Sequence, residues 1–102
     1  MKIIQELTDM ISEELDDSCR YVKEALRLKD ERPSVAQTFY GLSMDEMKHS
    51  EILHGEVVKI INEYKAQGQV VPEKMQAVYD YLHQKYIDKA HDVKVYMEQY
   101  KG

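Results

Sequence analysis

The chain has 102 residues with one Cys and no Trp; 32% of its residues are charged and its formal net charge is −5. Leu, Ile, Val and Phe make up about a quarter of the sequence, above the roughly 20% floor of disordered chains, so we expect one folded domain over residues 1–102. The acidic balance argues against a nucleic-acid partner, because phosphate binding needs clustered Lys and Arg. The single Cys19 allows neither an internal disulfide nor a zinc-finger spacing.

The apolar stretches are too short for a membrane span, which needs roughly 20 apolar residues. Lys59 and Asn62 interrupt the longest of them, and the N-terminus turns acidic by Glu6 without an apolar signal-peptide core. We therefore expect a cytoplasmic protein with no membrane partner.

The first predicted helix covers residues 2–30. Its apolar residues recur at alternating steps of three and four, which places them in one stripe on the helix surface. Glu14 lies inside this stripe, near the middle of the helix. The full stripe is Ile4, Leu7, Ile11, Glu14, Ser18, Tyr21, Ala25 and Leu28.

The second predicted helix covers residues 33–67, between a Pro suited to a first helical turn and Gly68. Its stripe contains two titratable residues, Glu46 and His49, among apolar ones. Their spacing puts a carboxylate and an imidazole on one helix face, although the same spacing also occurs in surface pairs. The stripe is Val35, Phe39, Leu42, Glu46, His49, Leu53, Val57 and Ile60.

The third predicted helix covers residues 72–100, from Pro72 onward, and its stripe has no carboxylate, so we expect it to pack outside the first two helices or to mediate assembly. We expect surface positions for His83, Asp88 and His91, which no apolar residues frame. We expect His54 either to contact the ligands of the Glu46 site without binding the metal itself or to be exposed. The stripe is Met75, Val78, Leu82, Tyr86, Ala90, Val93, Met97 and Tyr100.

A carboxylate buried in an apolar interface needs compensation by protonation, by an ion pair across an oligomer, or by a metal. If the first two helices run antiparallel around a turn near residue 32, Glu14, Glu46 and His49 lie at one height. This arrangement would let two helices contribute to one polar cluster inside an apolar stripe.

The pattern of Glu14, Tyr21, the segment 45–49 (Asp-Glu-Met-Lys-His) and Leu53 resembles the first helix pair of the rubrerythrin and ferritin-like superfamily, over roughly residues 7–61. The resemblance implies that Glu14, Glu46 and His49 are ligands of a non-haem di-iron centre. It also implies that Tyr21 hydrogen-bonds a ligand carboxylate. Mn or Zn would also suit these ligand types.

Full members of that superfamily carry a second such helix pair, whereas here only one helix follows Pro72. The resemblance therefore implies an all-α chain whose two long antiparallel helices form half of a dimeric four-helix bundle, in a homodimer or higher even-numbered homo-oligomer. The implied activity is ferroxidase-type oxidation of Fe(II), an oxidoreductase reaction. Short encapsulated ferritin-like proteins share this arrangement, but no shell-targeting extension is recognised after Tyr100.

Two alternatives stay open at this point. The chain could be an iron storage or delivery module that binds metal without turnover. It could also be a metal-free structural or interaction protein in which the acids pair across an oligomer.

Overall fold

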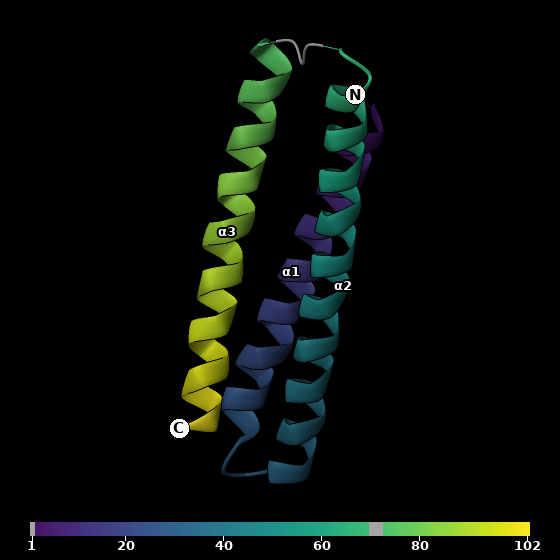
Figure 1. Ribbon diagram of the computed structural model, residues 1–102. Coiled ribbons are helices and arrows are strands. Elements are labelled where there is room, and N and C mark those ends of the chain that lie inside the picture. Colours follow the sequence, from purple (N-terminus) through teal and green to yellow (C-terminus); the bar gives the residue numbers. More distant parts are fainter. Residues whose placement is uncertain (1, 70–72) are drawn as a thin grey trace.

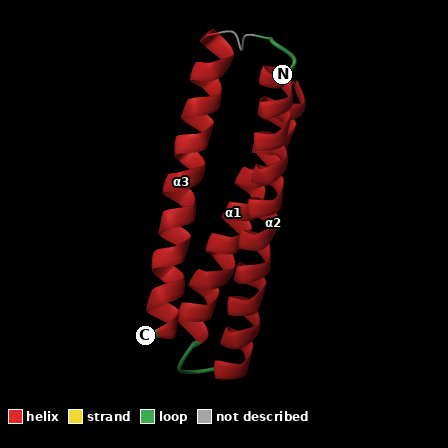
Figure 2. Ribbon diagram, in the orientation of Figure 1, coloured by secondary structure: helices red, strands yellow, loops and turns green. Residues whose placement is uncertain are grey.

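The structure is a computed structural model, and it describes residues 2–69 and 73–102, except for the side chains of residues 74 and 75. This part of the chain contains three helices and no strand (Figure 2). The all-α class and the three helices predicted from the sequence are therefore confirmed. The helices are α1 (Lys2–Leu28), α2 (Pro33–Ala66) and α3 (Glu73–Lys101).

The helix ends follow from local chemistry. α1 ends two residues before the predicted boundary, and the Arg32 N–H donates to the Leu28 carbonyl oxygen at 2.8 Å. Pro33 opens α2, where its missing N–H breaks no helical hydrogen bond. Gly68 follows α2 with φ +75°, a left-handed conformation that glycine adopts without steric cost. Two sequence expectations, a helix start at Pro72 and a packed Met75 side chain, lie outside the described residues.

The three helices lie side by side in a rod of 56 × 19 × 17 Å. α1 and α2 run antiparallel along their length, and α3 returns next to α1 (Figure 1). α1 contacts both other helices extensively, whereas α2 and α3 touch at few places. None of the described helices is both long and apolar enough to cross a membrane.

Small buried residues let α1 and α2 approach each other closely. The Ser18 hydroxyl donates to the Ser43 carbonyl oxygen, and the Ser43 hydroxyl donates to the Ser18 carbonyl oxygen, each at 2.7 Å. Both hydroxyls are fully buried and satisfied, so their burial carries no unpaired polar group. The reciprocal pair fixes the register of the two helices at a level 10 residues from the end of α1 and 10 residues from the start of α2.

The stripe predicted for α2 is only partly the face that this helix buries: Leu53 and Ile60 are half-buried against the core, but other stripe positions are exposed. Val35 is 44% exposed, Leu42 is 40% exposed and His49 is also exposed; Val57 is the one stripe residue in the buried set. The reason is that α2 carries apolar or small residues on two adjacent faces, and the smaller ones allow the closer approach to α1. The buried set of α2 is Ala36, Ser43, Met47, Ser50 and Val57.

The stripe predicted for α3 is buried only in its second half. Ala90, Val93 and Met97 belong to the hydrophobic core, whereas Val78 is exposed. α3 therefore packs as predicted near its C-terminal end, where it lies against α1.

Candidate metal centre

Glu14 from α1 comes together with Glu46 and His49 from α2. His49 Nδ1 lies 3.5 Å from Glu14 Oε2 and 3.8 Å from Glu46 Oε2. One potential ligand atom from each residue lies within 4.8 Å of the others. The predicted common height of these three residues is confirmed.

The serine pair explains why these side chains meet. Glu14 precedes Ser18 by about one turn, and Glu46 follows Ser43 by about one turn on the antiparallel partner helix. Because the Ser18–Ser43 hydrogen bonds hold the two helices in register, the two carboxylates are brought to the same level. His49 lies on the same face of α2, one turn beyond Glu46.

Glu14 has a carboxylate oxygen whose hydrogen-bonding capacity is not used by any residue that the structure describes. Its side chain is 28% exposed, yet its Oε2 atom is buried and has no hydrogen-bond partner among the described residues. No Lys or Arg in the described part of the chain forms a salt bridge with Glu14 or Glu46. A buried carboxylate oxygen without a partner costs free energy that a bound cation would offset.

The donor set fits a divalent metal. Two carboxylates and one imidazole suit Fe(II), Mn(II) or Zn(II), all of which take oxygen and nitrogen ligands in proteins. Three side chains are nevertheless fewer ligands than two metals need. The His49 side chain is 54% exposed, so the cluster lies at the edge of the chain rather than inside it.

The cluster opens away from α3. On α1, the side of Ser12 and Asp16 faces α3, since Lys89 of α3 contacts both residues. Glu14 is two positions from each of them, a rotation of roughly 200° around the helix axis. We call the uncovered surface beside the cluster the open face. By helical spacing, the exposed apolar side chains on it are Ile3 and Met10, 11 and four residues before Glu14 on α1, and Val35 and Leu42, 11 and four residues before Glu46 on α2.

Tyr21 is half-buried and packs beside an aromatic ring of the neighbouring helix. Its ring centroid lies 6.0 Å from that of Phe39, and the Arg20 guanidinium carbon lies 5.4 Å from the Tyr21 ring centre. The hydrogen bond to a ligand carboxylate that the resemblance implies stays a prediction. Cys19 packs against the hydrophobic core, as a small packing residue should.

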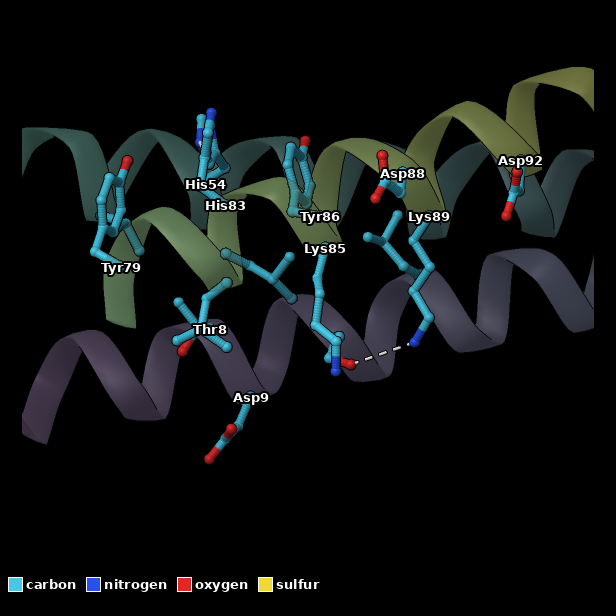
Figure 3. Close-up of a pocket in the computed structure, with 15 residues that line it drawn as sticks. Thr8, Asp9, His54, Tyr79, His83, Lys85, Tyr86, Asp88, Lys89 and Asp92 are labelled. Atoms are coloured by element: carbon cyan, nitrogen blue, oxygen red, sulfur yellow. Dashed lines mark hydrogen bonds between the residues drawn. The ribbon is translucent and has the colours of Figure 1, made fainter. Parts of the chain in front are cut away.

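The surface positions expected on α3 hold for two residues and fail for a third. Asp88 and His91 are exposed, and Asp88 accepts a hydrogen bond from Gln84 at 3.0 Å. His83 is half-buried instead, and its Nδ1 lies 3.2 Å from His54 Nε2 of α2 (Figure 3). The signal was present in the sequence, because His54 and His83 lie 14 residues before and 15 residues after Gly68.

Stability should depend on pH through His54. Burial lowers the pKa of His54 below its usual 6.5, and the neighbouring His83 lowers the pKa further. The unfolded chain then binds a proton more readily than the folded chain, so the free energy of unfolding should fall as pH drops below about 6.5. Urea unfolding at pH 7.5 and pH 5.5 measures this fall.

The His54→Gln variant should show a shallower fall than the unaltered chain, and His91→Gln serves as the exposed control. The other titratable groups beside the pair are Tyr79, Asp80 and Tyr86 of α3 and Glu51 of α2. An identical pH dependence in His54→Gln and the unaltered chain would exclude this role for His54.

No family model, characterised protein or solved structure matched this chain in the comparisons. The ferritin-like resemblance therefore rests on the residues of the chain itself. The geometry of Glu14, Glu46 and His49 is the observation from which a function has to be argued.

Proposed function

We propose that two copies of this chain pair through their open faces and bind two iron ions between them. In this proposal the ions are substrates, and Fe(II) is oxidised by dioxygen or peroxide in a ferroxidase-type reaction. The observation that carries the proposal is the buried Glu14 Oε2 atom, which has no hydrogen-bond partner within residues 2–69 and 73–102 as described and lies beside Glu46 and His49.

Charge and ligand number support a pair of chains. Each chain contributes two carboxylates and one imidazole, so two chains contribute four carboxylates and two imidazoles. Four negative charges balance two divalent ions. A two-fold axis supplies the second set of ligands without a second helix pair in the chain.

The open face supports the same pairing. Four exposed large apolar side chains lie on it, and burying them against a second copy removes that apolar surface from water. Together with α1 and α2 of one chain, the same helices of the second chain would form a four-helix bundle. α3 would remain outside this bundle, because it packs on the other side of α1.

Each residue of the proposed site would have a role that follows from its chemistry. Glu14 and Glu46 would hold the ions through carboxylate oxygens, whose negative charge stabilises Fe(III) more than Fe(II) and so favours oxidation. His49 would bind as a neutral imidazole. Tyr21, seven residues after Glu14 on α1, would orient a ligand carboxylate through its hydroxyl, as the resemblance implies.

Metal content and assembly state test the proposal together. Protein purified without added metal should show an even number of chains by native mass spectrometry and about one metal per chain by elemental analysis. Adding Fe(II) to the metal-free protein should raise the melting temperature, because the ions neutralise the gathered carboxylates. Oxidation of Fe(II) should then exceed the rate in buffer.

Other results of these experiments would contradict the proposal or favour one of the two alternative functions. A folded monomer that holds two metals contradicts the pairing. Iron binding without accelerated oxidation selects the storage or delivery module. A metal-free oligomer whose melting temperature does not respond to saturating metal selects the interaction protein.

A further inference from the structure

A second pair of potential metal ligands lies apart from the first cluster, where α2 and α3 touch. His54 Nε2 of α2 and His83 Nδ1 of α3 are 3.2 Å apart. Their ring centroids are 5.0 Å apart and their planes differ by 23°. Two imidazoles on two different helices therefore each place one nitrogen within contact distance of the other.

The separation of these nitrogens suits chelation. Two nitrogens bound to one tetrahedral zinc ion at about 2.0–2.1 Å lie roughly 3.3–3.4 Å apart. The observed separation of 3.2 Å is close to this spacing, and both rings would turn so that their lone pairs point at the ion instead of along the N–N line. A metal ion would replace this hydrogen bond, and each neutral ring would then carry its proton on the nitrogen that does not bind the ion.

Neighbouring aromatic rings hold the pair in place. The Tyr86 ring stacks on His54 at a centroid distance of 4.8 Å and an interplanar angle of 6° (Figure 3). The Tyr79 ring lies 5.7 Å from the His83 ring on the other side. Because packing limits both rotamers, little side-chain entropy would be lost when an ion binds.

Charged side chains of both signs surround the pair: Lys85 and Lys89 line the same cavity, and so do the carboxylates Asp9, Asp88 and Asp92. Glu51 and Asp80 each precede one of the histidines by three residues on the same helix, and both are exposed carboxylates one turn away. Burial lowers the pKa of His54, which keeps its lone pair available at neutral pH. The pair lines a cavity of about 520 Å³ among the three helices, which has room for the water ligands of a four-coordinate ion.

We propose that His54 and His83 form a second metal site, which chelates one Zn²⁺ or Cu²⁺ ion per chain and ties α3 to α2. Imidazole pairs favour ions of this borderline class. Since α2 and α3 otherwise touch at few places, the ion would link two helices that packing alone joins weakly. The site is complete within one chain and does not depend on the cluster of Glu14, Glu46 and His49.

Copper binding in the His49→Ala chain tests this site, because the first cluster then has no imidazole that could couple to the ion. We expect one tightly bound Cu²⁺ per chain, with an electron paramagnetic resonance spectrum that shows coupling to two imidazole nitrogens. Adding His54→Gln or His83→Gln should weaken Cu²⁺ binding roughly 100-fold, because one of two linked ligands is lost. Adding His91→Gln, which removes an exposed histidine of the same helix, should leave the affinity unchanged.

A spectrum with a single coupled nitrogen, or equal affinity with and without His54→Gln, would overturn the proposal. Should a Gln variant lose helical circular dichroism, histidine acylation of the unaltered chain gives the same test. Zn²⁺ should protect His54 and His83 from the acylating reagent and leave His91 reactive. Equal labelling of all three histidines with and without Zn²⁺ would also contradict the site.

Discussion

Replacing Glu46 with alanine should abolish iron binding and Fe(II) oxidation while α2 stays helical. The change removes one of two carboxylates that each chain offers to the metals, and alanine has the highest helix propensity. It also removes one negative charge from the metal-free cluster, so the metal-free chain should not lose stability through electrostatics. Iron content and the initial rate of Fe(II) oxidation, at equal chain concentration, measure the effect.

Asp45→Ala is the matched control, because it removes the same charge from the adjacent, exposed position of the same helix. His49→Ala should likewise lose metal affinity, and Glu14→Ala should weaken binding or slow oxidation. Asp88→Ala and His91→Ala should leave both quantities unchanged. If either α3 variant lowers iron content and oxidation rate as much as His49→Ala does, α3 belongs to the iron site and the two-fold assignment is wrong.

Replacing Leu42 with aspartate should separate the two chains and abolish iron oxidation although all three proposed ligands remain. Leu42 is 40% exposed in the single chain, so the chain itself tolerates a charge there. In a paired bundle the new carboxylate would be buried without a partner, which costs several kcal/mol. Native mass spectrometry reports the chain number, and iron content with oxidation rate reports the site.

Val95→Asp provides the control for this variant. Val95 is 42% exposed on α3, and a charge there should leave both assembly and oxidation intact. A Leu42→Asp monomer that still binds two irons and oxidises them would show that one chain completes the site. A Leu42→Asp protein that remains paired would show that the chains associate through another surface.

The sequence alone was sufficient to predict the three helices and to predict that the side chains of the proposed ligands lie close together. Pro33 and Gly68 mark helix boundaries through their backbone chemistry, which is local and can be read residue by residue. The common height of Glu14, Glu46 and His49 follows from one assumption, an antiparallel pair joined by a short turn. Helix rise is constant, so distance from the turn along the sequence becomes height in the fold.

Only the tertiary structure decided which face of α2 is buried. Val35 and Leu42 have the apolar character of core residues, yet Ser43 and Ser50 are fully buried. Hydrophobic periodicity could not anticipate this, because the close approach of α1 favours small side chains at these positions. The Ser43 hydroxyl is satisfied across the contact by Ser18, and the Ser50 hydroxyl donates to the Met47 carbonyl oxygen of its own helix.

The tertiary structure also decided the environment of His54 and His83. Their contact depends on how α3 packs against the other two helices. This packing is a long-range property that neither α2 nor α3 determines by itself. The same dependence explains why His91, eight residues further along the same helix, is exposed. Local patterns thus fixed where each side chain lies along its helix, and packing between helices determined what each side chain meets.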